Sequence, residues 1–260
     1  MPERADLPEA LRSFDLTGRV ALVTGASSGL GEGLARGLAS VGATVAVVAR
    51  RKERLETLAE EIGGLAVACD LLDAEQVWEV VPEVAASIGG PEILVNAAGH
   101  RVSQDAAEEE SPEAIRQTLE LNLVAPMALA QAVFPHMAEA GRGSIVNVSS
   151  IGGRVGVPGI PQASYAASKM GLSGLTAELA VQWAQHSIRV NTIAPGFFRS
   201  EITRELYDDE RGRDWLHRNT PLPMDGTVDD FVGAVLWLVS DAGRYVTGQT
   251  IVIDGGWTAR

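Results

Sequence analysis

Tyr165 and Lys169 are the residues of this sequence whose types and spacing most directly offer chemistry. They lie four residues apart in the stretch SYAASKMG, residues 164–171, and Lys169 is one of only two lysines in the chain. On a helix, residues i and i+4 share a face. An ammonium about 5 Å from a phenol, at an effective dielectric of about 20, lowers the phenol pKa from about 10 by about two units. Inside a cleft, the pair therefore predicts a tyrosine that can give and take a proton.

A pair of serines precedes this tyrosine in the stretch NVSS. Ser149 and Ser150 follow a run typical of a buried strand, which places them at the carboxyl end of that strand. A serine hydroxyl there could hydrogen-bond a substrate carbonyl beside the tyrosine. The four histidines show neither metal-ligand nor catalytic-triad spacing. We therefore expect acid–base chemistry at Tyr165 with no histidine and no metal.

A glycine-rich turn follows the first expected strand. Its sequence TGASSGLG places Gly25, Gly29 and Gly31 immediately before a helix-length segment. Glycines let the chain turn sharply and let a pyrophosphate approach the backbone, while the helix N-terminus offers free N–H groups. The spacing G-x-x-x-G-x-G differs from the commoner dinucleotide fingerprint, and such turns also form for packing alone. The first strand–helix junction is nevertheless where nucleotides bind in folds of this kind.

A basic cluster follows the second expected strand. A cofactor without a 2′-phosphate prefers an acid at the end of that strand, and Ala49 stands there instead. The helix dipole disfavours cations at a helix start, so a cluster placed there in an acidic protein favours an anionic ligand. The alternative is a solvated charge run balanced by nearby glutamates. The sequence thus favours NADP(H) over NAD(H). The cluster comprises Arg50, Arg51, Lys52 and Arg54.

Seven nearly continuous apolar runs alternate with helix-length segments. Two of those segments, 30–42 and 51–63, have apolar residues at helical spacing and end in glycine. Such runs are typical of parallel strands covered by helices on both faces. The pattern predicts an α/β fold, a single doubly wound (Rossmann-type) domain with a seven-stranded parallel sheet, which binds ligands beyond the carboxyl ends of its strands. The expected strands are 19–25, 43–49, 65–70, 92–99, 143–150, 187–196 and 249–256.

The composition limits the class of protein. With a formal net charge of −13, the 260-residue chain is a poor partner for nucleic acid or an anionic membrane. Its single cysteine, Cys69, rules out a disulfide framework within the chain. The charged N-terminal residues are unlike a secretory signal, and no uninterrupted apolar run reaches about 18 residues. These features predict a cytoplasmic protein.

We expect residues 1–15 to form an N-terminal extension and residues 16–260 to form one catalytic domain. Residues 197–226 carry charges of both signs and two prolines. The length of this piece is typical of a flap over a site, and the alternative is a solvated loop with a short helix.

Five motifs occur in order along the chain. They are TGASSGLG (24–31), NAAG (96–99), NVSS (147–150), YAASK (165–169) and PG (195–196). Together they resemble the short-chain dehydrogenase/reductase family, in the size class of 3-oxoacyl-carrier-protein reductases and gluconate dehydrogenases. The resemblance runs from about Leu16 to the segment YVTGQTIVIDGGW. It implies an oxidoreductase that acts on CH–OH groups with NAD(P) and is usually a homotetramer.

The resemblance also implies roles for particular residues. Tyr165 would be the general acid/base that protonates the carbonyl oxygen, and Lys169 would lower its pKa and bind the nicotinamide ribose. Ser150, rather than Ser149, would orient the substrate carbonyl, and Asn122 would hold a proton-relay water near the lysine. The residues implied to line the cofactor are Gly25, Ser27, Ser28, Gly29, Leu30, Gly31, Arg50, Arg51, Asp70, Leu71, Asn96, Ala97, Gly99, Tyr165, Lys169, Pro195, Gly196, Phe198 and Ser200.

The sequence departs from the family pattern at four places. NAAG replaces the commoner NNAG, Ser28 stands where many NADP-using members carry a basic residue, and Ser200 stands where threonine is usual. Fourteen residues separate Ser150 from Tyr165, two more than the pattern leads us to expect. This longer segment predicts a reshaped pocket wall.

Three functions remain open from the sequence. The first is an NADP(H)-dependent oxidoreductase acting on a carbonyl or secondary alcohol. The second is a catalytically silent nucleotide-binding sensor or scaffold, and the third is an NAD-dependent sugar-acid or alcohol dehydrogenase. The presence of both Tyr165 and Lys169 favours catalysis. Sugar acids, oxoacyl thioesters, steroids and small aromatic ketones all remain open as substrates.

Overall fold

A parallel sheet is the frame of the molecule. The structure is a computed structural model, and it describes residues 8–199 and 203–259. Within them, seven parallel strands pair in the order β3-β2-β1-β4-β5-β6-β7, so the strand order reverses between β1 and β4. The doubly wound sheet predicted from the sequence is confirmed. The strands are β1 (Val20–Thr24), β2 (Thr44–Ala49), β3 (Leu65–Ala68), β4 (Ile93–Asn96), β5 (Gly143–Val148), β6 (Ile188–Pro195) and β7 (Thr250–Ile253).

Apolar, largely β-branched runs form the central strands because both faces of the sheet are covered. Every residue of β4 and of β5 is buried, as expected for strands between two helical layers. β5 pairs with β6 up to its last residue, Val148, which lies opposite Ile193. The residues that follow these two strands, Ser149 and Gly196, therefore emerge at the same edge of the sheet.

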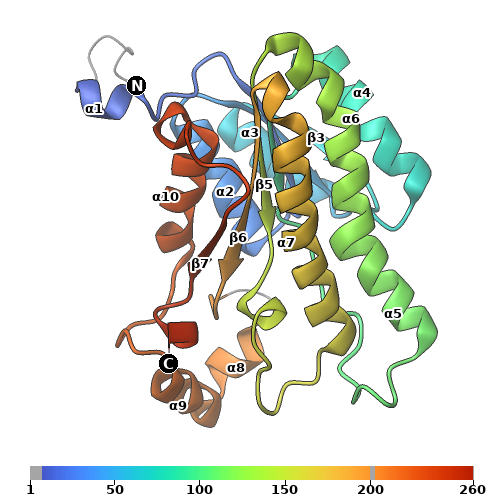
Figure 1. Cartoon of the computed structure of the whole chain (residues 1–260), viewed down its shortest axis with the longest axis vertical. Coiled ribbons are helices and arrows are strands. Elements are labelled where there is room, and N and C mark those ends of the chain that lie inside the picture. The colour runs from blue at the N-terminus through green and yellow to red at the C-terminus, as the bar shows by residue number, and fades with distance from the viewer. Residues whose placement is uncertain (1–7, 200–202, 260) are drawn as a thin grey trace.

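Helices cover both faces of the sheet (Figure 1). On one face, Phe231 and Leu34 belong to a core that includes alternate residues of β1 and β2, such as Val23 and Val45. On the other face, Leu129 packs in a second core. The first face carries α2 (Gly29–Ser40), α3 (Lys52–Ile62) and α10 (Val228–Val239), and the second carries α4 (Ala74–Ile88), α6 (Ala125–Ala140) and α7 (Ala163–Trp183).

One helical segment is long and contains a π-helix. It runs from α5 (Pro112–Leu119) through η2 (Glu120–Val124) into α6. Ser111 begins it as the N-cap, accepting a 3.2 Å hydrogen bond from the N–H of Ala114. By length and composition, Pro112–Ala140 could cross a membrane, a test that the core helix of a soluble protein also passes. Here α6 packs against α4, β4 and β5.

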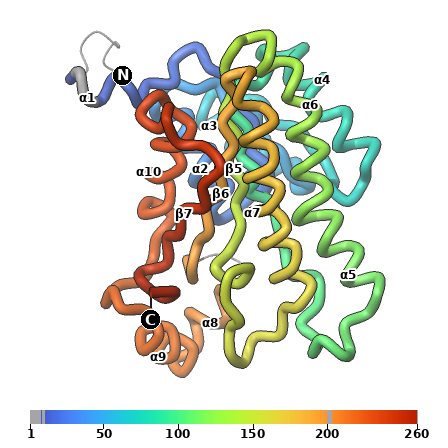
Figure 2. Tube along the Cα trace, viewed as in Figure 1, coloured from blue at the N-terminus to red at the C-terminus, as the bar shows by residue number. Residues whose placement is uncertain are grey.

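Residues 197–226 contain two helices where the sequence predicted a long irregular piece. These are α8 (Arg204–Asp208) and α9 (Glu210–Asn219). They lie near the carboxyl ends of β6 and β7, towards the bottom of the view in Figure 2. Tyr207 and Leu216 pack in a small apolar cluster with Trp257, which joins the two helices to the C-terminal end of the chain. The role of this piece as a flap stays a prediction.

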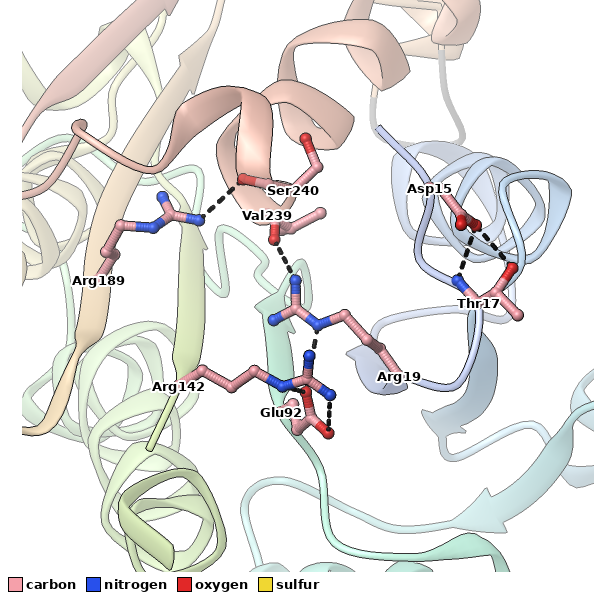
Figure 3. Close-up of polar contacts among 8 residues, drawn as sticks. All are labelled: Asp15, Thr17, Arg19, Glu92, Arg142, Arg189, Val239 and Ser240. Carbon is pink, nitrogen blue, oxygen red and sulfur yellow. Dashed lines mark hydrogen bonds and ion pairs between the residues drawn. The ribbon is translucent and has the colours of Figure 1, made fainter. Parts of the chain in front are cut away.

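An arginine cluster closes the opposite, amino edge of the sheet (Figure 3). Arg19 donates a 2.9 Å hydrogen bond to the carbonyl of the last residue of α10, and Arg189 donates one of 3.2 Å to the next carbonyl. Guanidinium groups are favourable at a helix C-terminus because its dipole end is negative. Glu92 forms ion pairs with both Arg19 (3.2 Å) and Arg142 (2.6 Å). The cluster therefore ties α10 to β1, β4 and β6 at the edge opposite the one that carries the loops of the five motifs.

Candidate active site at the carboxyl edge of the sheet

A cavity of about 480 Å³ lies at the carboxyl edge of the sheet. Its walls come from segments far apart in sequence: Leu30 from the glycine-rich turn, Ser150 from the loop after β5, Tyr165 from α7 and Gly196 from the end of β6. Glu205 of α8 adds an outer wall. Loops converge here because parallel strands end at one edge, where doubly wound folds bind ligands. This cavity is the candidate active site.

The tyrosine and the lysine stand in the first two turns of α7. Their side chains share one face, because Nζ of Lys169 lies 5.7 Å from the centre of the Tyr165 ring. Tyr165 lines the cavity, whereas Lys169 is only 3% exposed. The shared face predicted from the spacing is confirmed, and the catalytic role of the pair stays a prediction.

The buried ammonium of Lys169 is held by the sheet. Its Nζ donates a 2.8 Å hydrogen bond to the carbonyl oxygen of Val148, the last residue of β5. A Cβ at position 99 would lie 2.6 Å from this Nζ, so Gly99 leaves the space that the ammonium occupies. Burying a charge is costly unless the charge is hydrogen-bonded. A glycine at position 99 and the carbonyl of Val148 together make burial of the ammonium possible.

Burial controls the pKa of both groups. It lowers the pKa of Lys169 to about 8, because the ammonium loses its hydration. It raises the pKa of Tyr165, since a phenolate is disfavoured away from water; the hydrogen bond with Ser150 and the charge of Arg101 only partly oppose this. The lower tyrosine pKa predicted from the sequence is therefore wrong for this structure.

The two serines after β5 have different surroundings. The hydroxyl of Ser149 is buried and donates a 2.7 Å hydrogen bond to the carbonyl of Lys169, which fixes α7 against the sheet. The hydroxyl of Ser150 accepts the N–H of Gly152 at 3.0 Å and lies on the cavity wall within hydrogen-bonding reach of Tyr165. Of the two, Ser150 is therefore the one placed to meet a ligand.

Asn122 lies in the π-helix η2 and is fully buried. Its amide nitrogen donates to the carbonyl of His100 and to the hydroxyl of Ser168, both at 3.0 Å, and its amide oxygen accepts the N–H of His100 at 3.0 Å. π-Helical turns occur frequently at functional sites. These bonds join η2, α7 and the loop after β4 beside the lysine.

The glycine-rich turn is sharp, as expected, and its glycines pack closely against the chain's own backbone, which is the packing role that the sequence left open. Gly25 has φ +69°, a left-handed conformation that favours glycine, and a Cβ there would lie 2.8 Å from the backbone of Ala98. A Cβ at Gly31 would lie 2.4 Å from the carbonyl oxygen of Gly25. The turn therefore leads α2 tightly away from β1 and leaves the start of α2 at the edge where a phosphate could approach.

Arg51 reaches back to this turn. Its guanidinium donates to the hydroxyls of Ser27 (3.0 Å) and Ser28 (2.6 Å). Ser28 is the N-cap of α2, yet its hydroxyl accepts no N–H from that helix. A guanidinium and two hydroxyls beside a helix N-terminus form a donor set suited to phosphate. Burial lowers the pKa of His100, and the charges of Arg101 and then of the exposed Arg50 lower it further.

The other residues predicted to line the cofactor follow the strands at the same edge. The N–H of Ala97 donates to the hydroxyl of the last residue of β1 at 3.1 Å. The carboxylate of Asp70 accepts a 3.1 Å hydrogen bond from the N–H of Leu72. Phe198 packs its ring in the hydrophobic core. Ser200 lies outside the described residues. The remaining ones are Leu71 after β3, Asn96 at the end of β4, and Pro195 and Gly196 at the end of β6.

Comparisons with known proteins agree with this geometry. The family model described as enoyl-(acyl carrier protein) reductase matches residues 25–258. Gluconate 5-dehydrogenase of Gluconobacter oxydans (strain 621H) is 38% identical over 250 residues, covering 94% of this chain and 96% of that protein. D-threitol dehydrogenase of Mycolicibacterium smegmatis is 39% identical over 253 residues, covering 95% of each.

The chain belongs to the short-chain dehydrogenase/reductase family. A solved structure of the same family is the gluconate 5-dehydrogenase from Burkholderia cenocepacia J2315 in complex with NADP and tartrate. It is 36% identical, superposes with a TM-score of 0.91, and the match covers 97% of this chain and all of that one. The resemblance drawn from the five motifs is confirmed, and the protein is an oxidoreductase of this family.

The sequence of this dehydrogenase/reductase did not point to several polar residues of the cavity wall, among them Arg101 and Gln162. Arg101 and Gln162 both line the cavity, and Arg101 donates a 3.3 Å hydrogen bond to the carbonyl of Pro161. A cation two residues after NAAG, at the carboxyl end of β4, is a signal that could have identified Arg101. Gln162 belongs to the longer segment between Ser150 and Tyr165, and its sequence gave no comparable signal.

Titration of Lys169 tests the electrostatics of the site. Because burial lowers its pKa to about 8, the ammonium is charged below that pH and loses its proton as the pH rises through it. We expect the ε-carbon resonance of ¹³C-lysine-labelled protein to titrate with a midpoint of about 8. A Lys52→Arg variant leaves Lys169 as the only lysine, which assigns the signal. A midpoint above 10, the ordinary range of lysine, would contradict the effect of burial.

Proposed function

We propose that this protein is an NADP(H)-dependent oxidoreductase that transfers hydride between nicotinamide and a carbonyl or secondary-alcohol substrate. The observation that carries the proposal is the convergence of Ser150 and Tyr165 on one cavity wall, with the Lys169 ammonium 5.7 Å from the tyrosine ring. A wall that places a hydroxyl and a phenol side by side supports proton transfer to or from a bound carbonyl. It also supports catalysis over the nucleotide-sensor alternative.

The residues present fit a dinucleotide cofactor. The sharp turn through Gly25 and Gly31, where a Cβ would clash with the backbone of Ala98 or Gly25, places the start of α2 so that its N–H groups would hold the pyrophosphate. Arg51, with Ser27 and Ser28, would hold the 2′-phosphate of NADP(H). When bound, the nicotinamide supplies or accepts the hydride. The complex of the Burkholderia cenocepacia relative with NADP supports the same choice of cofactor.

Side chains of the cavity then transfer the proton to or from the substrate oxygen. The hydroxyl of Tyr165 gives its proton to the carbonyl oxygen in reduction and takes it back in oxidation. Its raised pKa keeps the phenol protonated near neutral pH, which suits the role of acid. Ser150 orients the carbonyl oxygen, Lys169 stabilises the phenolate and binds the nicotinamide ribose, and Asn122 holds a relay water beside the lysine.

Arg101 leads us to propose that the substrate carries a carboxylate. Among the described residues, no carboxylate lies within ion-pair distance of its half-buried guanidinium, and the whole chain is acidic. The guanidinium is near enough to Tyr165 to oppose the rise of its pKa. Arginine is suited to carboxylates because its planar donors match their geometry.

The rest of the wall is suited to hydroxyl groups. The buried amide nitrogen of Gln162 has no hydrogen-bond partner within the described part of the chain, although such donors are normally satisfied. Glu205 and Asp209 also line the cavity and can accept hydrogen bonds. A polyhydroxy acid would use Arg101 for its carboxylate and these polar groups for its hydroxyls. The gluconate dehydrogenases among the relatives support this class, whereas the D-threitol dehydrogenase represents a neutral polyol.

Exposed apolar side chains on three neighbouring helical segments bear on how the protein assembles. Val124, Met127 and Met170 are exposed by 40–48% along η2, α6 and α7, and such an apolar face is typical of subunit contacts. We propose a homotetramer in the cytoplasm, with one catalytic domain over residues 16–260 and a flap over 197–226.

Replacing Tyr165 by phenylalanine tests the catalytic assignment. We expect kcat to fall by about 10²–10⁴-fold, because the proton donor is lost, while the Kd for NADPH, measured by fluorescence titration, stays within about twofold. Activity that survives in Tyr165→Phe would show that another group is the acid.

Replacing Arg51 by glutamine tests the cofactor assignment. A lost charge-assisted contact to phosphate is worth about 1.5–3 kcal/mol, so KM for NADPH should rise about 10–100-fold. KM for NADH should not change. Lys52→Gln is the matched control, because Lys52 lies next in the sequence and pairs with Glu56 on the helix surface. Equal effects on NADPH and NADH would refute a 2′-phosphate site at Arg51.

Replacing Arg101 by glutamine tests the substrate class. We expect KM for gluconate to rise about 10–100-fold through loss of a charge-assisted contact, with KM for glucitol, the neutral alditol of the same length, unchanged. Any effect through Tyr165 would lower kcat for both compounds alike. The exposed Arg154, in the loop after β5, provides the control variant Arg154→Gln. An unchanged KM for the acid would refute a carboxylate site.

A further inference from the structure

Helix α7, which carries the proposed acid, receives no hydrogen bond from the side chain of its own N-cap residue. The N-cap residue Gln162 makes no side-chain hydrogen bond to the helix, and the first turn contains no acidic residue. The side chains of their own N-cap residues cap four other helices, α4 by Asp73, α5 by Ser111, α9 by Asp209 and α10 by Thr227, whereas α2, α3 and α6 have no such cap. The difference matters because the first N–H groups of a helix have no partner inside it.

Glu110, from a distant loop, supplies the missing cap. Its carboxylate accepts the N–H of Ser164 at 3.2 Å and also accepts the hydroxyl of Ser164. The two residues are 54 positions apart, and Ser164 is only 7% exposed. A carboxylate at this end of a helix satisfies orphan donors and complements the positive end of the dipole.

The loop that delivers Glu110 is itself well fixed. The N–H of Glu110 donates to the carbonyl of Ala106 at 3.0 Å, which closes a turn, and the next residue, Ser111, is the N-cap of α5. The same loop touches the segment before α7 a second time, through the bond from Arg101 to the carbonyl of Pro161. The start of α7 is thus tied at two points to the loop after β4, which also borders the cavity.

We propose that Glu110 is a positioning residue for the general acid. Tyr165 directly follows Ser164 and lies in the first turn of α7, where helices fray. Lys169 lies one turn further on and is held independently by Val148 and by the Ser149 hydroxyl on its carbonyl. Loss of the cap therefore displaces the tyrosine and leaves the lysine in place. This inference rests on the proposed role of Tyr165.

Kinetics of Glu110 variants, together with hydrogen exchange, test the inference. In Glu110→Ala we expect kcat to fall at least about tenfold, with the Kd for NADPH within about twofold of wild type, and amides of residues 163–168 to exchange at least about tenfold faster. Glu110→Gln should recover most of kcat, because the amide oxygen still accepts from Ser164. Glu109→Ala is the matched control, since Glu109 is an exposed neighbour on the same loop, and should match wild type.

Three results would overturn the inference. The first is unchanged exchange over residues 163–168 in Glu110→Ala, which would mean that no cap exists. The second is faster exchange with unchanged kcat, which would mean that the cap does not position the acid. The third is an equal loss of kcat and cofactor affinity, which would indicate general damage. Exchange needs no turnover, so failure of the proposed function would show separately, as wild-type protein that reduces no carbonyl.

Discussion

Burial of the Lys169 ammonium is the constraint on which the rest of the site depends. A charge can lie in this interior only where a carbonyl at the end of β5 accepts its hydrogen bond and where residue 99 has no side chain. The pKa of about 8 shows how strongly the surroundings disfavour the charge. The helix, the strand and the loop after β4 must therefore meet closely around this ammonium.

The parallel sheet makes such precision possible. All of its strands end at one edge, so segments that are far apart in the sequence deliver their side chains to one cavity. Polar bonds then fix α7 from two directions: Ser149 holds its second turn against β5, and Glu110 holds its first turn from the other side. At the amino edge, the arginine cluster around Glu92 ties α10 in a similar way. The sheet supplies the frame, and buried polar contacts set the exact orientation of the helices on it.

Charge is distributed unevenly between the surface and the cavity. The chain has a net charge of −13. Two of its guanidinium groups nevertheless lie where we expect ligands to bind: Arg51 contacts the glycine-rich turn, and Arg101 lines the cavity. An acidic surface keeps a protein soluble and repels nucleic acid. A half-buried guanidinium, in contrast, offers an anionic ligand a partner of opposite charge. In our proposal both ends of the site hold anions, a cofactor phosphate at one end and a substrate carboxylate at the other.

The sequence by itself determined the seven-stranded sheet, the glycine-rich turn and the shared face of Tyr165 and Lys169. These are local properties, since strand and helix periodicity and a four-residue spacing need only neighbouring residues. It was wrong on the pKa of Tyr165, because that depends on how far the phenol is removed from water. Only the tertiary structure brought Glu110 to Ser164, across 54 positions, and Arg101 to the segment before α7, across 60. No spacing in the sequence reports such contacts, because the fold of the intervening chain sets the distance between their partners.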